Sequence, residues 1–402
     1  MIRVSTADLY LNSQNAINAD QSAMMTTTAE LSSGKQINSP SDNPVGAAQA
    51  ALLQSDLTQL GQYKSNQAQA TQLLNNASST VTQALNVMQS VQTSLVEAGN
   101  GTLSDANRSA IAAQLQQDLN QLVGLANTSD GQGGYLFGGS VNSTPPFVQS
   151  GNNVTYVGDD LVPGLQISQT RSEQVKYSGA AVFMSIPTGN GTFVTAANTN
   201  NAGTAAISTG SVTDPSALTG DQYTISIGAG GATYTITQTP PGTTGPSLPY
   251  NNNGPTTLPI PGMQVTLSPG AQPGDTFTIS PSTNQSIFSA IASAISALQT
   301  PTTTAAAATR VSAAITTALS GAQQAISSLS TTQSSMGAQL AELNTYGTIN
   351  SDQTLQDQTQ MSSIVDLNYA QGASQLSQQQ TEYQAALQSY AAISKLSLFN
   401  YI

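Results

Sequence analysis

The feature that most constrains this fold is a seven-residue hydrophobic repeat that occurs in both the first and the last third of the sequence. We call its positions the rod seam: Leu74, Val81, Met88, Leu95, Ile315, Leu329, Met336 and Leu343. A repeat of this length is typical of long helices that pack along one narrow stripe. Because a single helix cannot bury its own stripe, the two ends of the chain are predicted to pack together as an antiparallel coiled coil or helical bundle.

The sequence between the two helical parts differs in composition and in period. Gly, Pro, Thr and Asn become frequent, and alternating segments such as "QYTISIG", "ATYTITQ" and "DTFTISP" indicate strands joined by turns. The sequence therefore predicts an α+β chain, an elongated multi-domain rod with a β-rich domain inserted between two helical halves. The predicted segments are 1–43 (N-terminal helix of a terminal domain, and a hinge), 44–134 and 284–347 (the halves of a helical rod domain), 135–283 (the inserted outer domain) and 348–402 (the C-terminal helix of the terminal domain).

Local signals place several helix ends. Pro301 is suited to start the last rod helix, and Gly347 is expected to interrupt it. Near the N-terminus, Gly34 can adopt the left-handed conformation that ends a helix, whereas Asn43 and Pro44 are suited to the cap and first residue of the next one. Four residues are predicted to form a polar hinge there: Gly34, Pro40, Asn43 and Pro44.

The composition argues against several classes of protein. The formal net charge is −12, and the eight Lys and Arg residues are scattered singly, so binding to nucleic acid is not expected. No segment approaches the roughly 18 apolar residues of a membrane helix, and no membrane partner is predicted. Cys and His are absent, which removes disulfides and the usual transition-metal ligands, and no cofactor is predicted.

Catalytic sites have little support in the residues. Asp159 and Asp160 are adjacent carboxylates, but a calcium site needs more oxygen ligands, and a Gly-flanked pair is more typical of a solvated loop. The segment "IGAGGATY" at 227–234 lacks the Lys-Ser/Thr ending of a phosphate-binding loop, which favours a hairpin turn. We therefore predict no catalytic residue, no cofactor-binding residue and no metal ligand.

Four segments resemble one family. "LSSGKQINSPSDNPVGA" resembles the N-terminal signature of the flagellin superfamily, and its "SPSDNP" is similar to that of the members found at the junction of hook and filament. The start "MIRVSTADLY", the segment "GGYLFGGSVNSTPPF" and the terminus "YQAALQSYAAISKLSLFNYI" agree with this. Gln36 departs from the family, which usually has Arg at this position.

The resemblance implies a function and a set of partners. It implies a structural, non-enzymatic adaptor that joins hook to filament, is exported unfolded through the flagellar type III channel, and is located outside the cell. The implied partners are copies of the chain in a ring, a neighbouring hook-associated protein and flagellin. A cytosolic export chaperone is expected to bind at about 355–402.

The last helix carries the predicted contact surface. We call it the terminal seam, and it consists of Tyr369, Leu376, Tyr383, Leu387, Tyr390, Ile393, Leu398 and Phe399. The repeat alone favours an intramolecular core, whereas the resemblance implies a surface for assembly and for the chaperone. Two alternatives stay open at this point: flagellin itself, and a secreted enzyme carried on a helical stalk.

Overall fold

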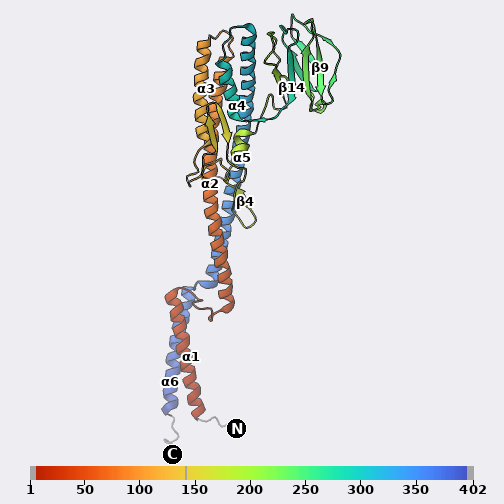
Figure 1. Cartoon of the computed structure of the whole chain (residues 1–402). Coiled ribbons are helices and arrows are strands. Elements are labelled where there is room, and N and C mark those ends of the chain that lie inside the picture. Colours follow the sequence, from red (N-terminus) through yellow and green to blue (C-terminus); the bar gives the residue numbers. More distant parts are fainter. Residues whose placement is uncertain (1–5, 141–142, 396–402) are drawn as a thin grey trace, which may run out of the picture. The chain divides into compact units, whose positions relative to one another are not determined.

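The computed structural model describes residues 6–140 and 143–395, and the chain divides into two compact units (Figure 1). The terminal unit combines residues 1–65 with 345–402, and the central unit comprises residues 66–344. Helices α2 (Pro44–Ala98) and α5 (Ala305–Val365) contribute to both units. Helices from both ends of the sequence flank a region of antiparallel strands, which confirms the predicted α+β class with a β-rich insertion.

In the terminal unit, α1 (Thr6–Ser33) lies along α6 (Tyr369–Lys395) (Figure 1). Gly34, with φ of 73°, ends α1 as predicted, and its N–H donates to the Glu30 carbonyl at 2.8 Å. The chain that follows is tied to the end of α5: the Gln36 N–H donates to the Val365 carbonyl at 2.8 Å, and the Leu367 N–H donates to the Gly34 carbonyl at 2.9 Å. These backbone hydrogen bonds therefore join the segment between α1 and α2 to the segment between α5 and α6, and we call this place the joint.

The start of α2 follows the predicted signals. Its first residue is Pro44, and the Asn43 side-chain oxygen accepts from the Gly46 N–H at 2.9 Å. Between the helices, the Asp42 carboxylate accepts from the N–H groups of Asn38 and Ser39 at 3.0 and 2.7 Å. The local conformation of the segment is thus defined by hydrogen bonds, and movement about it stays a prediction.

Substituting Gly34 tests this joint. A Cβ atom at Gly34 lies 2.8 Å from the Tyr369 hydroxyl, and the positive φ disfavours any L side chain. We expect Gly34→Ala to lower the free energy of unfolding of the terminal unit by about 1–2 kcal/mol. Gly61→Ala is the control, because it lies inside α2 with nothing within 4 Å and should stabilise the helix slightly. Urea unfolding followed by circular dichroism compares the two, and equal effects would contradict the proposed role of Gly34.

Two predicted boundaries of the last rod helix are wrong. Helix α5 continues through Gly347 to Val365, because one interior glycine costs only about 1 kcal/mol and does not break a helix. The chain leaves helical conformation at 366–368 instead, where Asn368 caps α6 by accepting from the Gln371 N–H at 3.3 Å. At its other end α5 begins at Ala305 and not at Pro301, with Thr304 as the capping side chain.

The central unit contains the hydrophobic seam of the long helices. Helices α3 (Asp105–Ala126) and α4 (Ile287–Leu298) pack together beside α2 and α5, and Ser104 and Ser286 cap their N-termini. All eight rod-seam residues are buried, at 0–4% exposure: Leu74, Val81, Met88, Leu95, Ile315, Leu329, Met336 and Leu343. A continuous apolar interior therefore runs along this part of the helices.

The predicted insertion at 135–283 divides into two structural parts. In the first, hairpins β1 (Phe147–Ser150)/β2 (Asn153–Tyr156) and β3 (Gly164–Gln166)/β4 (Ser172–Gln174) and a π-helix (Ala180–Met184) belong with the bundle. The β1/β2 hairpin contacts α3 and α4. Three phenylalanine rings of this part, Phe137, Phe147 and Phe183, pack around one centre with Phe288 of α4.

The second part is a two-sheet β domain. The strand pair β5 (Ile186–Pro187)/β15 (Asn284–Gln285) lies where the chain enters and leaves it. One sheet has the order β10-β9-β8-β14-β6, with β11 also on β9, and the other has the order β12-β13-β7. The bounds are β6 (Phe193–Ala197), β7 (Ser211–Val212), β8 (Gln222–Ile227), β9 (Thr233–Thr239), β10 (Thr243–Thr244), β11 (Leu248–Pro249), β12 (Thr256–Ile260), β13 (Met263–Leu267) and β14 (Thr276–Pro281).

Both sheets contribute to the core of this domain. Alternate residues of β8, β13 and β14 point inward, as the period of the sequence predicts, and they include Ile225, Val265 and Phe277, each fully buried. Strands β8 and β9 are joined by the predicted hairpin turn, in which the Gly231 N–H donates to the Gly228 carbonyl at 2.9 Å. The Gly-rich segment therefore has a structural explanation.

Candidate assembly surface

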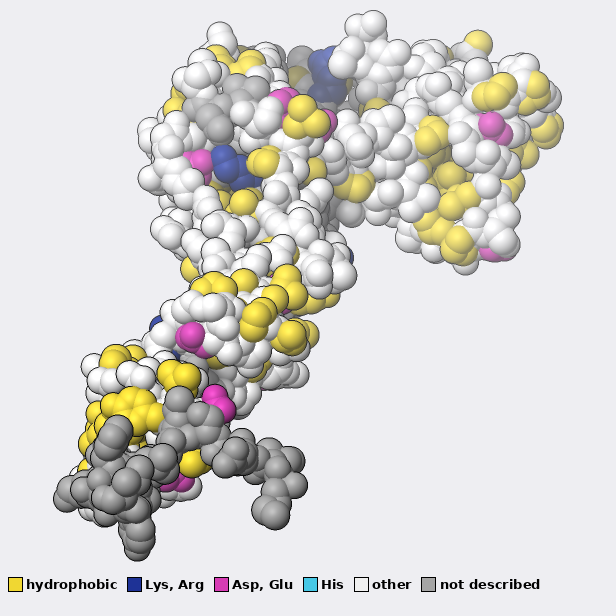
Figure 2. All heavy atoms as spheres, turned by 90° about the horizontal axis from the view of Figure 1, so that it is seen from below, with side chains coloured by type: hydrophobic (Ala, Val, Ile, Leu, Met, Phe, Trp, Pro, Cys, Tyr) yellow, Lys and Arg dark blue, Asp and Glu magenta, His cyan; other side chains and the backbone are white. Residues whose placement is uncertain are grey.

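The terminal unit buries very little hydrophobic surface. Among its described residues, Tyr63 is the one hydrophobic side chain that is buried, whereas the central unit contains all the other buried hydrophobic residues. The large hydrophobic side chains exposed in the terminal unit are Leu9, Tyr10, Leu11, Met25, Val45, Leu52, Ile349, Leu355, Tyr369 and Leu387. Figure 2, the view from below, shows hydrophobic side chains at the surface among few charged ones.

The terminal seam does not form a single buried stripe. Leu376, Tyr383 and Tyr390 are half-buried in the pairing of α6 with α1. The rings of Tyr390 and Tyr10 lie 4.9 Å apart, and their hydroxyl groups are hydrogen-bonded. Leu387, in contrast, is 41% exposed. This helix therefore contacts α1 through one face and presents a hydrophobic side chain outside that face.

Other members of the terminal seam have different positions. Tyr369, which the seven-residue spacing places with Leu376, is 58% exposed and lies beside Gly34 at the joint. It differs because it is the first residue of α6, where the pairing with α1 ends. Ile393 belongs to α6, but its side chain lies outside the described residues, as do Leu398 and Phe399 entirely.

One residue at the joint was not predicted to have a role. The Gln36 side-chain amide donates to the Ile364 carbonyl at 2.7 Å, and its backbone N–H donates to the Val365 carbonyl. Gln36 therefore satisfies two carbonyls at the end of α5, which have no partner within their own helix. In the sequence, only its departure from the family pattern distinguished Gln36. Residue spacing cannot predict its contact with Ile364, because the two residues are far apart in sequence.

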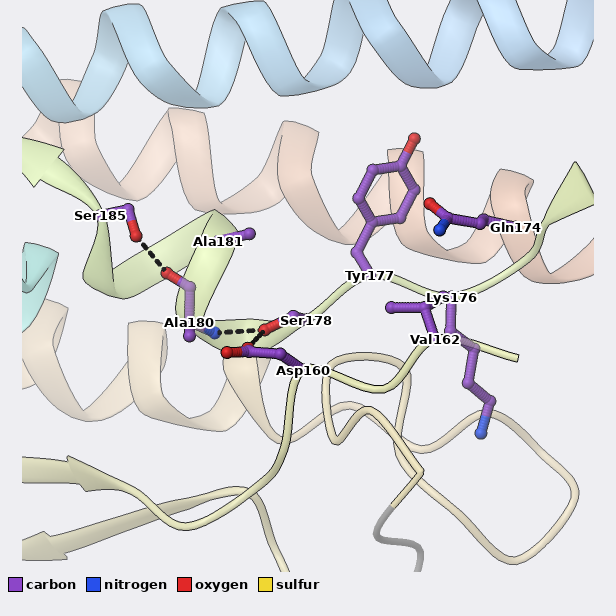
Figure 3. A pocket seen from close by; sticks show the side chains of 9 residues that line it. All are labelled: Asp160, Val162, Gln174, Lys176, Tyr177, Ser178, Ala180, Ala181 and Ser185. Atoms are coloured by element: carbon purple, nitrogen blue, oxygen red, sulfur yellow. Dashed lines mark hydrogen bonds between the residues drawn. The ribbon is translucent and has the colours of Figure 1, made fainter. Parts of the chain in front are cut away.

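A pocket of about 380 Å³ lies in the central unit (Figure 3). Its polar groups already support the fold. Ser178 donates to Asp160 and accepts from the Ala180 N–H, and the Tyr177 hydroxyl is hydrogen-bonded to Gln339 on α5. Figure 3 shows the Lys176 amine pointing away from Asp160. These bonds give the pocket a structural explanation.

The partner of Lys176 is Asp130, at 2.8 Å in a buried ion pair. Burial raises the pKa of Asp130, but hydrogen bonds from Lys176 and from the N–H groups of Gln132 and Gly134 outweigh it, so that its pKa is below the ordinary value of 3.8. Ionised Asp130 therefore stabilises the folded chain. That stabilisation is complete above the unfolded pKa and is lost as the pH falls through the lower folded value.

We therefore expect the central unit to lose stability in acid, below about pH 4. Asp130→Asn removes this part of the acid dependence, and it also lowers stability at neutral pH because Lys176 is left buried without its counter-ion. Urea unfolding at a series of pH values measures both effects. The exposed residue Asp56 supplies a control, Asp56→Asn, which should keep the acid loss. An unchanged acid dependence in Asp130→Asn would contradict the assignment.

Within residues 6–140 and 143–395, no helix has the length and hydropathy needed to cross a membrane. The same residues contain no group of three or more Asp or Glu side chains arranged to hold a metal ion. The predicted loop role of Asp159 and Asp160 agrees with their contacts, since Asp159 accepts from the Ser140 N–H at 2.7 Å and Asp160 accepts from Ser178.

Two family models match parts of the sequence. Residues 4–142 match the bacterial flagellin N-terminal helical region, and residues 196–281, in the two-sheet domain, match the D2-like domain of flagellar hook-associated protein 1. The predicted resemblance to the flagellin superfamily is thereby confirmed. The second match shows that the inserted domain also has a counterpart among hook-associated proteins.

Similarity over nearly the full length of the chain is found with hook-associated proteins 3. Flagellar hook-associated protein 3 of Escherichia coli is 27% identical over 399 residues, covering 99% of both chains. The crystal structure of hook-associated protein 3 from Legionella pneumophila matches with a TM-score of 0.72 and 28% identity, covering 78% of this chain and 98% of that one. Flagellin of Salmonella derby is 30% identical, but over only 130 residues, 32% of this chain and 26% of that one.

Proposed function

We infer that this chain, a full-length relative of flagellar hook-associated protein 3, is a structural component of the bacterial flagellum that joins the hook to the filament. The flagellin alternative has weaker support, because the flagellin of Salmonella derby matches over only 130 residues, 32% of this chain. The relatives are structural proteins, and the polar groups of the large pocket are used within the fold. The proposed role is therefore mechanical and not catalytic, which also sets aside the stalked enzyme.

The observation that carries the mechanism is the difference in burial between the two units. Burying an apolar side chain such as Leu or Val contributes about 1.5–3 kcal/mol, and the central unit buries many of them. The terminal unit buries one described hydrophobic residue and exposes ten large ones. A unit with this surface gains stability when another subunit covers it. We propose that the terminal helices become fully ordered only on assembly.

The partners follow from this surface. We propose that the exposed residues on α1, α2, α5 and α6 contact copies of the chain in a ring, a neighbouring hook-associated protein and flagellin. Before assembly, a cytosolic export chaperone is proposed to cover about 355–402, which includes Leu355, Tyr369 and Leu387. Secretion of the unfolded chain through the flagellar export channel is consistent with the absence of Cys, because no disulfide can hinder threading.

Immunogold labelling tests the location. Antibodies raised against residues 190–281 should label a short zone at the hook end of each filament, and deletion of the gene should leave hooks without filaments while flagellin accumulates in the medium. Complementation with the full chain should restore filaments. Label along the whole filament would contradict the junction role and favour flagellin.

A further inference from the structure

Asp118 on α3 has a buried carboxylate that accepts only long hydrogen bonds. It is 5% exposed. One carboxylate oxygen accepts from the Ser90 hydroxyl at 3.4 Å, and the other accepts from the Gln114 amide at 3.2 Å. Both donors are neutral, and both distances are long for a bond to an ionised carboxylate. Burial accordingly raises the pKa of Asp118.

Other buried carboxylates in the central unit are better compensated. Asp130 has Lys176 at 2.8 Å, and Glu173 has Arg171 at 3.1 Å. Asp275 accepts from three backbone N–H groups at 2.8–3.1 Å. Among the described residues, Asp118 has neither a cation nor a backbone N–H within hydrogen-bonding distance. An ionised carboxylate in this situation costs free energy unless a further donor reaches it.

A pocket of about 230 Å³ opens beside this carboxylate. Val87 and Asp118 are buried in its wall, whereas Gln83, Asn86 and Gln121 are exposed side chains of α2 and α3. Since a water molecule takes up about 30 Å³ of liquid, the pocket has room for several waters or for the end of one long side chain. Apart from Val87, every lining side chain carries an oxygen acceptor: Gln83, Asn86, Ser90, Asp118 and Gln121.

We propose that this pocket receives the cationic end of an Arg or Lys side chain from a neighbouring flagellar protein subunit, with Asp118 as its counter-ion. The proposal rests on the proposed function, which places other subunits around this chain. Charge favours an external donor, because the net charge is −12. Several of the chain's own cations already have partners, since Arg108, Arg171 and Lys176 form ion pairs and Arg310 donates to the Thr199 carbonyl.

Nuclear magnetic resonance with a small probe tests the site itself. Ethylguanidinium chloride, titrated below denaturing concentrations, should shift the side-chain amide signals of Gln83, Asn86 and Gln121 in a saturable way. Its neutral analogue ethylurea should not. Asp118→Asn keeps the shape but removes the charge, and we expect the dissociation constant for ethylguanidinium to rise about tenfold. Equal shifts from both probes, or a titration unchanged by Asp118→Asn, would overturn the site.

Crosslinking in the assembled flagellum tests the partner. With a photo-crosslinking amino acid at Gln83, we expect a link to a flagellar subunit through a peptide that contains Arg or Lys, and a several-fold lower yield when Asp118→Asn is added. If the guanidinium site is present but no subunit links, the pocket binds free cations only and the proposal fails. Immunogold labelling of the same cells separates the two failures: label at the hook boundary without a crosslink overturns this inference alone, whereas label along the filament overturns the proposed function.

Discussion

Phe183→Ala will lower the free energy of unfolding of the central unit by about 3–5 kcal/mol. The Phe183 side chain is fully buried, with its ring edge-to-face on Phe137 at 5.1 Å and on Phe147 at 5.5 Å. Such aromatic pairs contribute about 0.5–1.5 kcal/mol each beyond the area that they bury. Phe288 on α4 completes the cluster at 6.1 Å, so the substitution leaves a cavity where hairpin, π-helix and bundle meet.

Denaturant unfolding of the purified chain measures this effect, with the transition of the central unit followed by tyrosine fluorescence or circular dichroism. Val96→Ala is the matched control, since Val96 is a hydrophobic residue of the same unit that is 61% exposed, and its replacement should change stability by less than about 0.5 kcal/mol. A loss from Phe183→Ala no larger than that of the control would show that the aromatic cluster does not hold the bundle and the hairpins together.

Leu11→Ser combined with Met25→Ser will abolish filament attachment while leaving the purified monomer almost unchanged. The two side chains are 55% and 59% exposed, and their spacing places them on one face of α1, away from the half-buried residues Ile17 and Met24. They therefore contribute little to the isolated chain. If they are buried by a neighbouring subunit, each replacement costs on the order of 2 kcal/mol per interface, repeated around the ring.

Electron microscopy of complemented deletion cells measures the outcome, and we expect at least about tenfold fewer filaments per cell than with the unmodified chain. Val96→Ser with Leu161→Ser is the matched control, because these residues are 61% and 70% exposed in the central unit. Normal filament numbers in the α1 variant, or an equal loss in the control, would contradict the assignment of the assembly surface to the terminal unit.

The sequence predicted the elements well where one local pattern determines them. The seven-residue repeat, the Asn43–Pro44 helix start and the alternating strands all appear in the structure, because side-chain period and capping act over a few residues. The same local signals failed at Gly347, where a single glycine was given more weight than the helix around it. Nothing in the alternation of residues 147–174 shows that these hairpins pack on the bundle and not in the outer domain.

The surface was harder to predict than the fold. The predicted terminal seam grouped Tyr369, Leu376 and Leu387, whereas the structure gives them three environments: beside Gly34, against α1, and exposed. Which face of a helix is covered depends on its neighbours, and these are distant in sequence. Contacts such as Gln36 with Ile364, or the uncompensated burial of Asp118, arise from tertiary packing and have no signal in spacing or composition.

Amide hydrogen exchange of the purified full chain, followed by mass spectrometry, tests most directly whether the terminal helices depend on other subunits for their order. We expect amides of α1 and α6 to exchange at least about a thousandfold faster than those around the rod-seam residues Val81 and Leu329, because only the latter lie in a packed interior. The slow rates should extend to α1 and α6 once subunits assemble. Equal protection of the terminal and central helices in the monomer would contradict the account.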